Sequence, residues 1–199
     1  MKGLTFNQII EGRRAALANA RQLIQESALL HDHGHWARVV FLCQIAGEEL
    51  GKVFLFAATH MQMVAEPEKV KWNKVWKQLT SHKAKSKLMN HMEDLLISNR
   101  EIQEDYLTVL DGEISELEIG KQKALYSDLT ENRFFVPSQL FNDEMATNAL
   151  KWARGRLEFV TSYDSMLEVA LKSATKESIE KAAERLGAAK LLERLRKRN

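Results

Sequence analysis

Two short clusters of ionisable side chains carry most of the chemistry that this sequence offers. Glu48, Glu49 and Lys52 interrupt an otherwise apolar stretch. Further along the chain, His82 and Lys85 stand three residues apart, a spacing that puts both on one face of a helix. Carboxylates and amines among apolar neighbours are costly unless they are paired or hydrogen-bonded. The first cluster therefore predicts either an intrahelical Glu–Lys pair that also ties down a neighbouring helix, or a polar site between helices.

The second cluster lies where a helix is expected to begin, because the cap-forming residue Ser81 precedes His82. The free backbone amides of a helix start favour anions, so His82 and Lys85 indicate a phosphate site. Lys83 and Lys87 extend its positive field. The alternative is a solvated basic first turn. Acidic residues are the ones that stabilise a first turn, so this stretch departs from a local rule, as functional sites often do.

The other candidate chemistries are weaker. His31, His33 and His35 surround Asp32 and Gly34, and imidazole suits transition metals. Their alternation across a glycine turn does not fix a coordination geometry, so we expect a polar turn, with no metal site and no cofactor. No Glu-x-x-His motif, phosphate loop or dinucleotide-binding glycine motif occurs. The single cysteine, Cys43, lies in an apolar run and is expected in the core.

The composition predicts an all-α fold that would position these clusters. The chain has 199 residues with only 9 Gly and 2 Pro, which favours long helices and a single helical domain over residues 1–199. We expect an antiparallel up-and-down bundle with residues 36–64 as its central, mostly apolar helix. Apolar spacing and cap residues predict helices over residues 7–31, 36–64, 67–79, 82–110, 119–129, 142–169 and 175–195, with an apolar loop over 134–137.

Charge and length exclude some classes of protein. Residues 66–92 and 172–199 are basic and residues 93–118 are acidic, within a net charge of only +2, so the chain is not a uniformly basic nucleic-acid coat. No apolar run approaches the roughly 20 residues of a membrane span. A single cysteine and the lack of a secretory signal favour a soluble protein in the reducing cytoplasm.

Several of these segments together resemble one protein family, the AbiV-type abortive infection family of the HEPN superfamily. The resemblance covers about residues 10–130. Its most specific part is the run Glu48-Glu-Leu-Gly-Lys52 followed by His82-x-x-Lys85. The supporting segments are Asn19-Ala20, Trp36-Ala-Arg38, Ala46-Gly47, Trp76, and Lys121-Gln-Lys-Ala-Leu-Tyr126-Ser-Asp128.

The resemblance implies a HEPN-type helical bundle, here with additional C-terminal helices, that dimerises and serves bacterial anti-phage defence. Members of the wider superfamily are often metal-independent endoribonucleases with an Arg-x(4–6)-His motif, which this sequence lacks. The partners that it implies are a second copy of the chain, RNA, and a phage-encoded activator or a component of the host translation machinery, with no membrane. Lys83, Lys87 and Arg38 are then the expected RNA-binding residues.

Two functions remain open on this basis. In the first, His82 acts as acid or base in RNA cleavage, because imidazole titrates near neutrality. Lys85 and Lys52 then hold the phosphate, and Glu48 or Glu49 orients the imidazole or a lysine. In the second, the same five residues form a buried polar network that only fixes helix packing. The protein is then a binding module without chemistry, which blocks translation or phage development by docking a protein or RNA partner.

Overall fold

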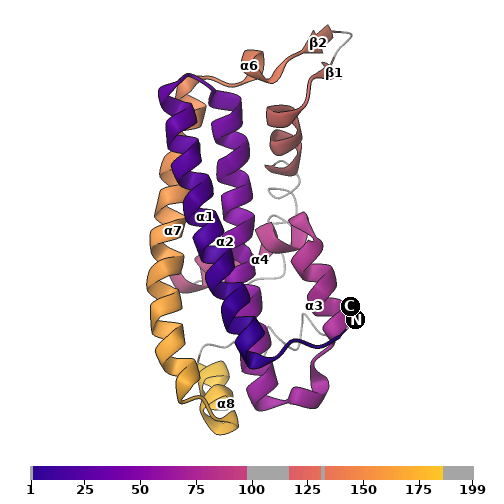
Figure 1. The fold of residues 1–199 in the computed structure, drawn as a ribbon, viewed down its shortest axis with the longest axis vertical. Coiled ribbons are helices and arrows are strands. Elements are labelled where there is room, and N and C mark those ends of the chain that lie inside the picture. Colours follow the sequence, from indigo (N-terminus) through magenta and orange to yellow (C-terminus); the bar gives the residue numbers. More distant parts are fainter. Residues whose placement is uncertain (1, 98–116, 131–132, 186–199) are drawn as a thin grey trace.

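The computed structural model describes residues 2–97, 117–130 and 133–185, and these fold mainly into helices (Figure 1). The first half contains α1 (Phe6–Asp32), α2 (Trp36–Ala65), η1 (Pro67–Lys69), α3 (Trp72–Thr80) and α4 (His82–Ile97). A helical segment over residues 117–125 follows. The second half contains β1 (Asp128–Thr130), β2 (Arg133–Phe135), α6 (Pro137–Leu140), α7 (Asp143–Lys172) and α8 (Lys176–Arg185). The all-α prediction is confirmed.

Local signals in the sequence set the ends of the long helices. Thr5 forms a capping box with Gln8 at the start of α1. The turn into α2 uses Gly34, whose φ of 74° suits a residue without a side chain. Asn142 caps α7 by accepting a hydrogen bond from the amide of Met145. These three helices accordingly lie within a few residues of their predicted bounds.

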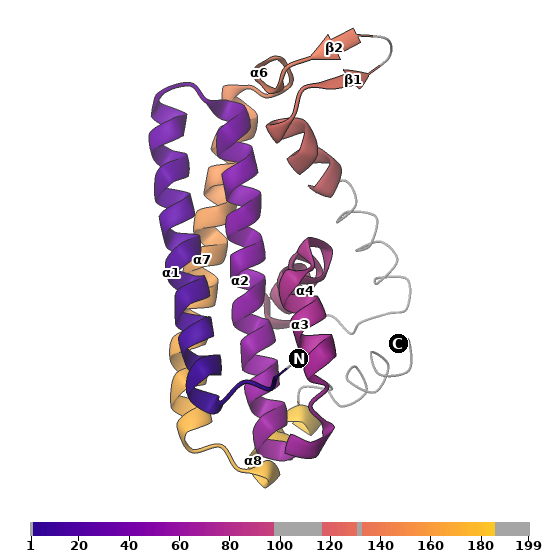
Figure 2. The same ribbon diagram turned by 45° about the vertical axis from the view of Figure 1, so that its right-hand side comes forward.

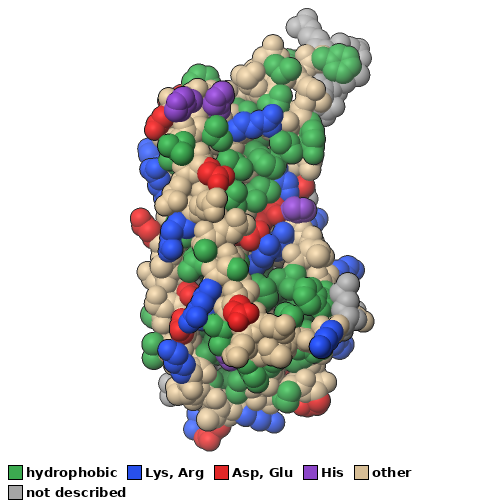
Figure 3. Space-filling view, viewed as in Figure 1, with side chains coloured by type: hydrophobic (Ala, Val, Ile, Leu, Met, Phe, Trp, Pro, Cys, Tyr) green, Lys and Arg blue, Asp and Glu red, His purple; other side chains and the backbone are tan. Residues whose placement is uncertain are grey.

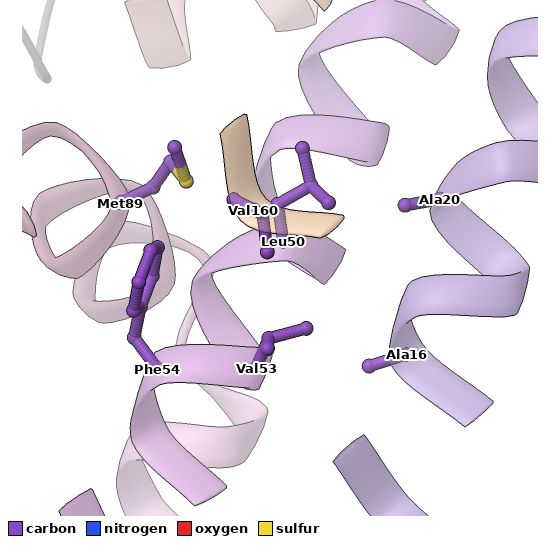
Figure 4. Close-up of a cluster of buried hydrophobic side chains, with 7 residues drawn as sticks. All are labelled: Ala16, Ala20, Leu50, Val53, Phe54, Met89 and Val160. Carbon is purple, nitrogen blue, oxygen red and sulfur yellow. The ribbon is translucent and has the colours of Figure 1, made fainter. Parts of the chain in front are cut away.

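Helix α2 is the centre of the bundle, and α1, α4 and α7 pack around it (Figures 1 and 2). One core cluster joins all four helices: Ala16 and Ala20 from α1, Leu50, Val53 and Phe54 from α2, Met89 from α4 and Val160 from α7 (Figure 4). Helix α1 runs antiparallel to α2 and α7, whereas α2 and α7 run in the same direction. As predicted, α2 is buried on most of its sides, because it has neighbours all round.

The region before α7 differs from the prediction. The expected helix over residues 119–129 ends at residue 125, and the expected apolar loop over 134–137 lies in the second strand of an antiparallel hairpin and at the start of a short helix. In the hairpin, Asp128 pairs with Phe135 and Thr130 with Arg133. Threonine and aromatic residues favour strands, and a hairpin this short leaves little periodicity to detect. The predicted helical residues 98–110 and 186–195 lie outside the described residues.

None of the helices in the described part of the chain has the length and hydropathy that a membrane span requires.

Candidate active site around Glu48

The carboxylate of Glu48, buried in the middle of α2, contacts basic side chains from two other elements. His82 Nδ1 lies 2.5 Å from Glu48 Oε2, and Lys85 Nζ lies 3.3 Å from the same oxygen. Lys121, on the helical segment 117–125, donates to Glu48 Oε1 at 2.9 Å. Lys121 also pairs with Glu118 at 2.7 Å. One carboxylate therefore links α2, α4 and the segment 117–125.

Exposure divides these side chains into two groups. The side chains of Glu48, Lys85 and Lys121 are 3 to 6% exposed, whereas that of His82 is 57% exposed. Since Nδ1 of His82 faces Glu48, a neutral ring donates its proton there and keeps Nε2 as an acceptor. The arrangement presents an oriented imidazole at the surface, supported by a buried carboxylate.

The electrostatics of the buried group keep Glu48 ionised. Burial alone would raise the pKa of Glu48, but hydrogen bonds from Lys121 and His82 and the charges of Lys121 and Lys85 outweigh it, so that the pKa falls below its ordinary value. Burial would lower the pKa of Lys121, and its contacts with Glu118 and Glu48 outweigh this and raise that pKa. The charged forms of both groups are thus the stable ones.

Two local features bring α4 to this position. Ser81 directly follows the last residue of α3. Its Oγ accepts a hydrogen bond from the backbone amide of Ala84 at 3.2 Å, so that α4 begins at His82. Gly51 lets α4 approach α2 closely, because a Cβ atom at this position would lie 2.2 Å from the backbone oxygen of Lys85. The run from Glu48 to Gly51 therefore supplies both the carboxylate and the space for the helix that carries its partners.

The other predicted site residues of α2 lie apart from this cluster. The intrahelical ion pair is made by Glu49 rather than Glu48, since Lys52 Nζ donates to Glu49 Oε1 at 2.6 Å. Lys85, which was expected to hold a phosphate, is buried against Glu48 instead. The structure thus brings Glu48, His82 and Lys85 together and leaves Glu49 and Lys52 as a separate pair.

The three predicted RNA-binding residues are divided between two regions. Lys83 is exposed beside His82, and Lys87 is half-buried one turn further along α4. Arg38 is ten residues from Glu48, about 15 Å along the helix axis, and donates to the backbone oxygen of Leu125 at 3.1 Å. Arg38 therefore supports the packing of the segment 117–125 and lies away from His82.

Lys121 belongs to the Glu48 cluster, although no role was predicted for it from the sequence. It is part of the Lys121–Asp128 run in the family resemblance, and this run was the only signal that could have indicated it.

A small hollow adjoins Lys121 and is lined by Glu48, Gln44, Asn90, Trp152 and Arg156 among others. In this hollow, Arg156 donates to Asn90 at 2.7 Å and lies 3.7 Å from the centre of the Trp152 ring. On the face in Figure 3, acidic, basic and histidine side chains meet at mid-height.

The histidine-rich turn between α1 and α2 makes polar contacts within the bundle. His31 Nε2 lies 2.9 Å from the hydroxyl of Thr147 and 3.2 Å from Asp143 Oδ1. His33 Nδ1 contacts the backbone oxygen of Leu29 at 2.8 Å. Within residues 2–97, 117–130 and 133–185, no three His, Cys, Asp or Glu side chains are grouped as metal ligands.

The fold and this site define an all-helical bundle with a buried ionic centre and an exposed histidine. The family model for AbiV, a HEPN-type family, matches residues 8–158, which is more than half of the chain. The chain belongs to the AbiV family. The match extends beyond the segments that carried the resemblance and includes the first half of α7. No curated protein and no solved structure matches the chain.

Proposed function

We propose that this protein is an abortive-infection factor that cleaves RNA, with His82 as its acid–base residue. The observation that carries the proposal is the contact between the exposed His82 ring and the buried Glu48 carboxylate at 2.5 Å. Membership of the AbiV family supports the role in phage defence.

In this mechanism Nε2 of His82 takes the proton from a ribose 2′-hydroxyl. The 2′-oxygen attacks the adjacent phosphorus, and the bond from phosphorus to the 5′-oxygen breaks, with a proton from water going to that oxygen. The products are a 2′,3′-cyclic phosphate and a 5′-hydroxyl end. The exposed Lys83, next to His82, offers positive charge to the phosphate as negative charge develops.

Glu48, Lys85 and Lys121 act as positioning residues in this proposal. Their burial keeps them from direct contact with a polymer, so their effect reaches the substrate through His82. Glu48 fixes the tautomer and the orientation of the imidazole, as carboxylates do in other catalytic pairs. The two buried lysines keep Glu48 ionised.

A binding module without chemistry is the second candidate, and one observation favours it. The same ionic cluster connects α2, α4 and the segment 117–125, as a purely architectural network would. The two candidates differ in what His82 does. Its side chain is largely exposed. Removal of His82 should therefore change the stability of the protein only a little, even if its role is structural.

The test compares full-length wild type with His82→Ala, and uses His35→Ala as the matched control. His35 is also exposed, and its side chain makes no cap hydrogen bond. We expect His82→Ala to cut the rate of cleavage of single-stranded RNA by about 100-fold or more, the scale of lost general base catalysis. His35→Ala should cleave normally. Cleavage that is unchanged in a folded His82→Ala protein would contradict the role of His82, and a folded wild-type protein that cleaves no RNA would favour the binding module.

The same variants can be expressed in cells with and without phage challenge. RNA fragments that appear with wild type and disappear with His82→Ala would support a nuclease. Intact RNA together with unaltered growth arrest would support docking of a protein partner.

A further inference from the structure

Helix α3 carries a row of lysines that its own fold does not use. Lys71, Lys74 and Lys77 are exposed and recur every three residues, so they lie along one side of the helix. Figure 3 shows Lys and Arg side chains on the side of the molecule where α3 lies.

These lysines are not neutralised within the described part of the chain. No acidic side chain there pairs with Lys71, Lys74, Lys77 or Lys83. Lys69, a few residues earlier, shows the contrast, since it pairs with Glu66. Among the residues that the structure describes, the row therefore presents positive charge without an acidic partner.

The placement of the charge is also unfavourable for the helices themselves. The first turns of α3 and α4 contain no acidic residue, although acidic residues stabilise a helix start. Lys71 stands at the N-cap of α3 without a side-chain cap, and Lys74 follows in the first turn. Lys77 is favourably placed in the last turn of α3, but helix stability does not explain Lys71 and Lys74, whereas an anionic ligand would.

An aromatic ring lies between the lysines. A shallow depression in the surface is lined by Lys71, Trp72, Asn73 and Lys74. Trp72 is half-buried, and one edge of its indole faces the backbone of Gly3. Cationic side chains that alternate with an accessible aromatic ring are typical of surfaces that bind single-stranded nucleic acid, where the phosphates pair with lysines and a base stacks on the ring.

The row leads to the candidate active site. Helix α3 ends at Thr80 and α4 begins at His82, so Lys77 stands one turn before the end of α3 and Lys83 directly after the histidine. From Lys71 to Thr80 the helix rises about 14 Å. We propose that the lysine row of α3, with Trp72, is a docking track for single-stranded RNA that delivers the backbone to His82. This inference rests on the proposed function and adds the surface that holds the substrate.

The experiment measures binding of a fluorescent single-stranded oligoribonucleotide at several salt concentrations. All proteins are full-length and carry His82→Ala, so that cleavage does not interfere. The track variant adds Lys71→Gln, Lys74→Gln and Lys77→Gln. The control adds Lys123→Gln, Lys151→Gln and Lys176→Gln, which remove the same charge from exposed positions on other elements.

We expect the track variant to bind between tenfold and a hundredfold more weakly at 0.1 M salt, with a slope of log K against log salt that is smaller by about 2. The control should lose less than about threefold. Trp72→Leu should weaken binding by about tenfold without changing the slope, as loss of a stacked base does. Melting curves establish that each variant is folded.

Equal binding by the track variant and the control would overturn the track and leave His82 cleavage intact. Loss of binding in the track variant, combined with a wild-type protein that cleaves no RNA, would support the track and contradict the proposed function. Displacement of the RNA by duplex RNA, an acidic peptide or anionic vesicles at equal charge would also overturn the assignment to single-stranded RNA.

Discussion

Nδ1 of His82 and Oε2 of Glu48 lie 2.5 Å apart, although the two residues are separated by 34 positions in the chain. One side chain is exposed and the other is buried. The pair therefore divides the work of a site, because His82 is available to a substrate while Glu48 sets its orientation from within the bundle. Substitution of His82 should therefore affect mainly activity, whereas substitution of Glu48 should also lower the stability of the protein.

Glu48→Gln should lower the free energy of unfolding by about 3 kcal/mol or more. The change leaves Lys85 and Lys121 buried without their shared counter-charge, and an uncompensated buried charge has a cost of this size. For a domain of this length the melting temperature should fall by about 6–12 °C. Thermal unfolding followed by circular dichroism measures it.

Glu49→Gln is the matched control for Glu48→Gln, since it changes the neighbouring carboxylate. Its partner Lys52 is 24% exposed and can turn to water, so the cost should stay near 1 kcal/mol. Equal losses in the two variants would show that Glu48 has no special place in the network.

The pH dependence of stability gives the same variant a second readout. The pKa of Glu48 is held below its ordinary value of 4.5 in the folded protein, so the unfolded chain takes up the proton first as the pH falls. The stabilisation from Glu48 is present above pH 4.5 and is lost as the pH falls through the folded pKa. Glu48→Gln should flatten this part of the wild-type curve.

The family resemblance and the ionisable residue types placed the Glu48–Lys52 run and the His82–Lys85 step in one candidate site. They could not decide which carboxylate faces His82. Adjacent residues on a helix point about 100° apart, and the rotation of α2 is set by long-range packing, such as Trp152 against Gly47. Periodicity in a single segment contains no information about that neighbour.

Lys121 and the β1–β2 hairpin show a second limit. Lys121 reaches Glu48 across 73 positions, and no local pattern marks such a contact. The hairpin strands have three residues each, which is too few for an alternation to be distinguished from a helical run. The ends of α1, α2 and α7 were predictable because capping depends on residues within one turn.

Gly51→Ala should separate α4 from α2. The added Cβ would lie 2.2 Å from the backbone oxygen of Lys85, and backbone cannot rotate away as a side chain does. Overpacking of this kind costs about 1–3 kcal/mol, and the shift should also move His82 from Glu48 and reduce RNA cleavage. Urea denaturation and the cleavage assay measure the two effects.

Gly155→Ala is the natural comparison for Gly51→Ala. Gly155 lies within α7 with nothing within 4 Å of a Cβ atom, so alanine should stabilise the helix by about 1 kcal/mol. If both substitutions stabilised the protein, α4 could not lie as close to α2 at Gly51 as described above.

His60 should make the protein less stable as the pH falls below 6.5. Burial, together with the nearby charge of Arg13, lowers the pKa of His60 below its ordinary value. The unfolded chain therefore binds the proton first, and the free energy of unfolding decreases from pH 6.5 down to the folded pKa. The ring also contacts Phe6, with centroids 5.0 Å apart. His60→Gln should remove this dependence of the unfolding free energy on pH, whereas His35→Gln should keep it. Denaturation at a series of pH values between 7 and 5 measures the difference.

Lys121 and Glu48 should be energetically coupled, and a double-mutant cycle can measure how strongly. Lys121→Met removes one of the three basic side chains around the buried Glu48, and Glu48→Gln removes one of the two carboxylates that contact the buried Lys121, so each single change should destabilise the protein. The double variant removes both charges of the pair, and its loss of stability should be smaller than the sum of the single losses by about 1–3 kcal/mol.

The control for this cycle is Lys123→Gln, which lies two residues from Lys121 and is exposed, and it should change the stability by less than about 0.5 kcal/mol. Losses that add within about 0.5 kcal/mol would mean that the segment 117–125 is not held by this contact. Strong coupling together with reduced cleavage in Lys121→Met would make that segment part of the support for His82.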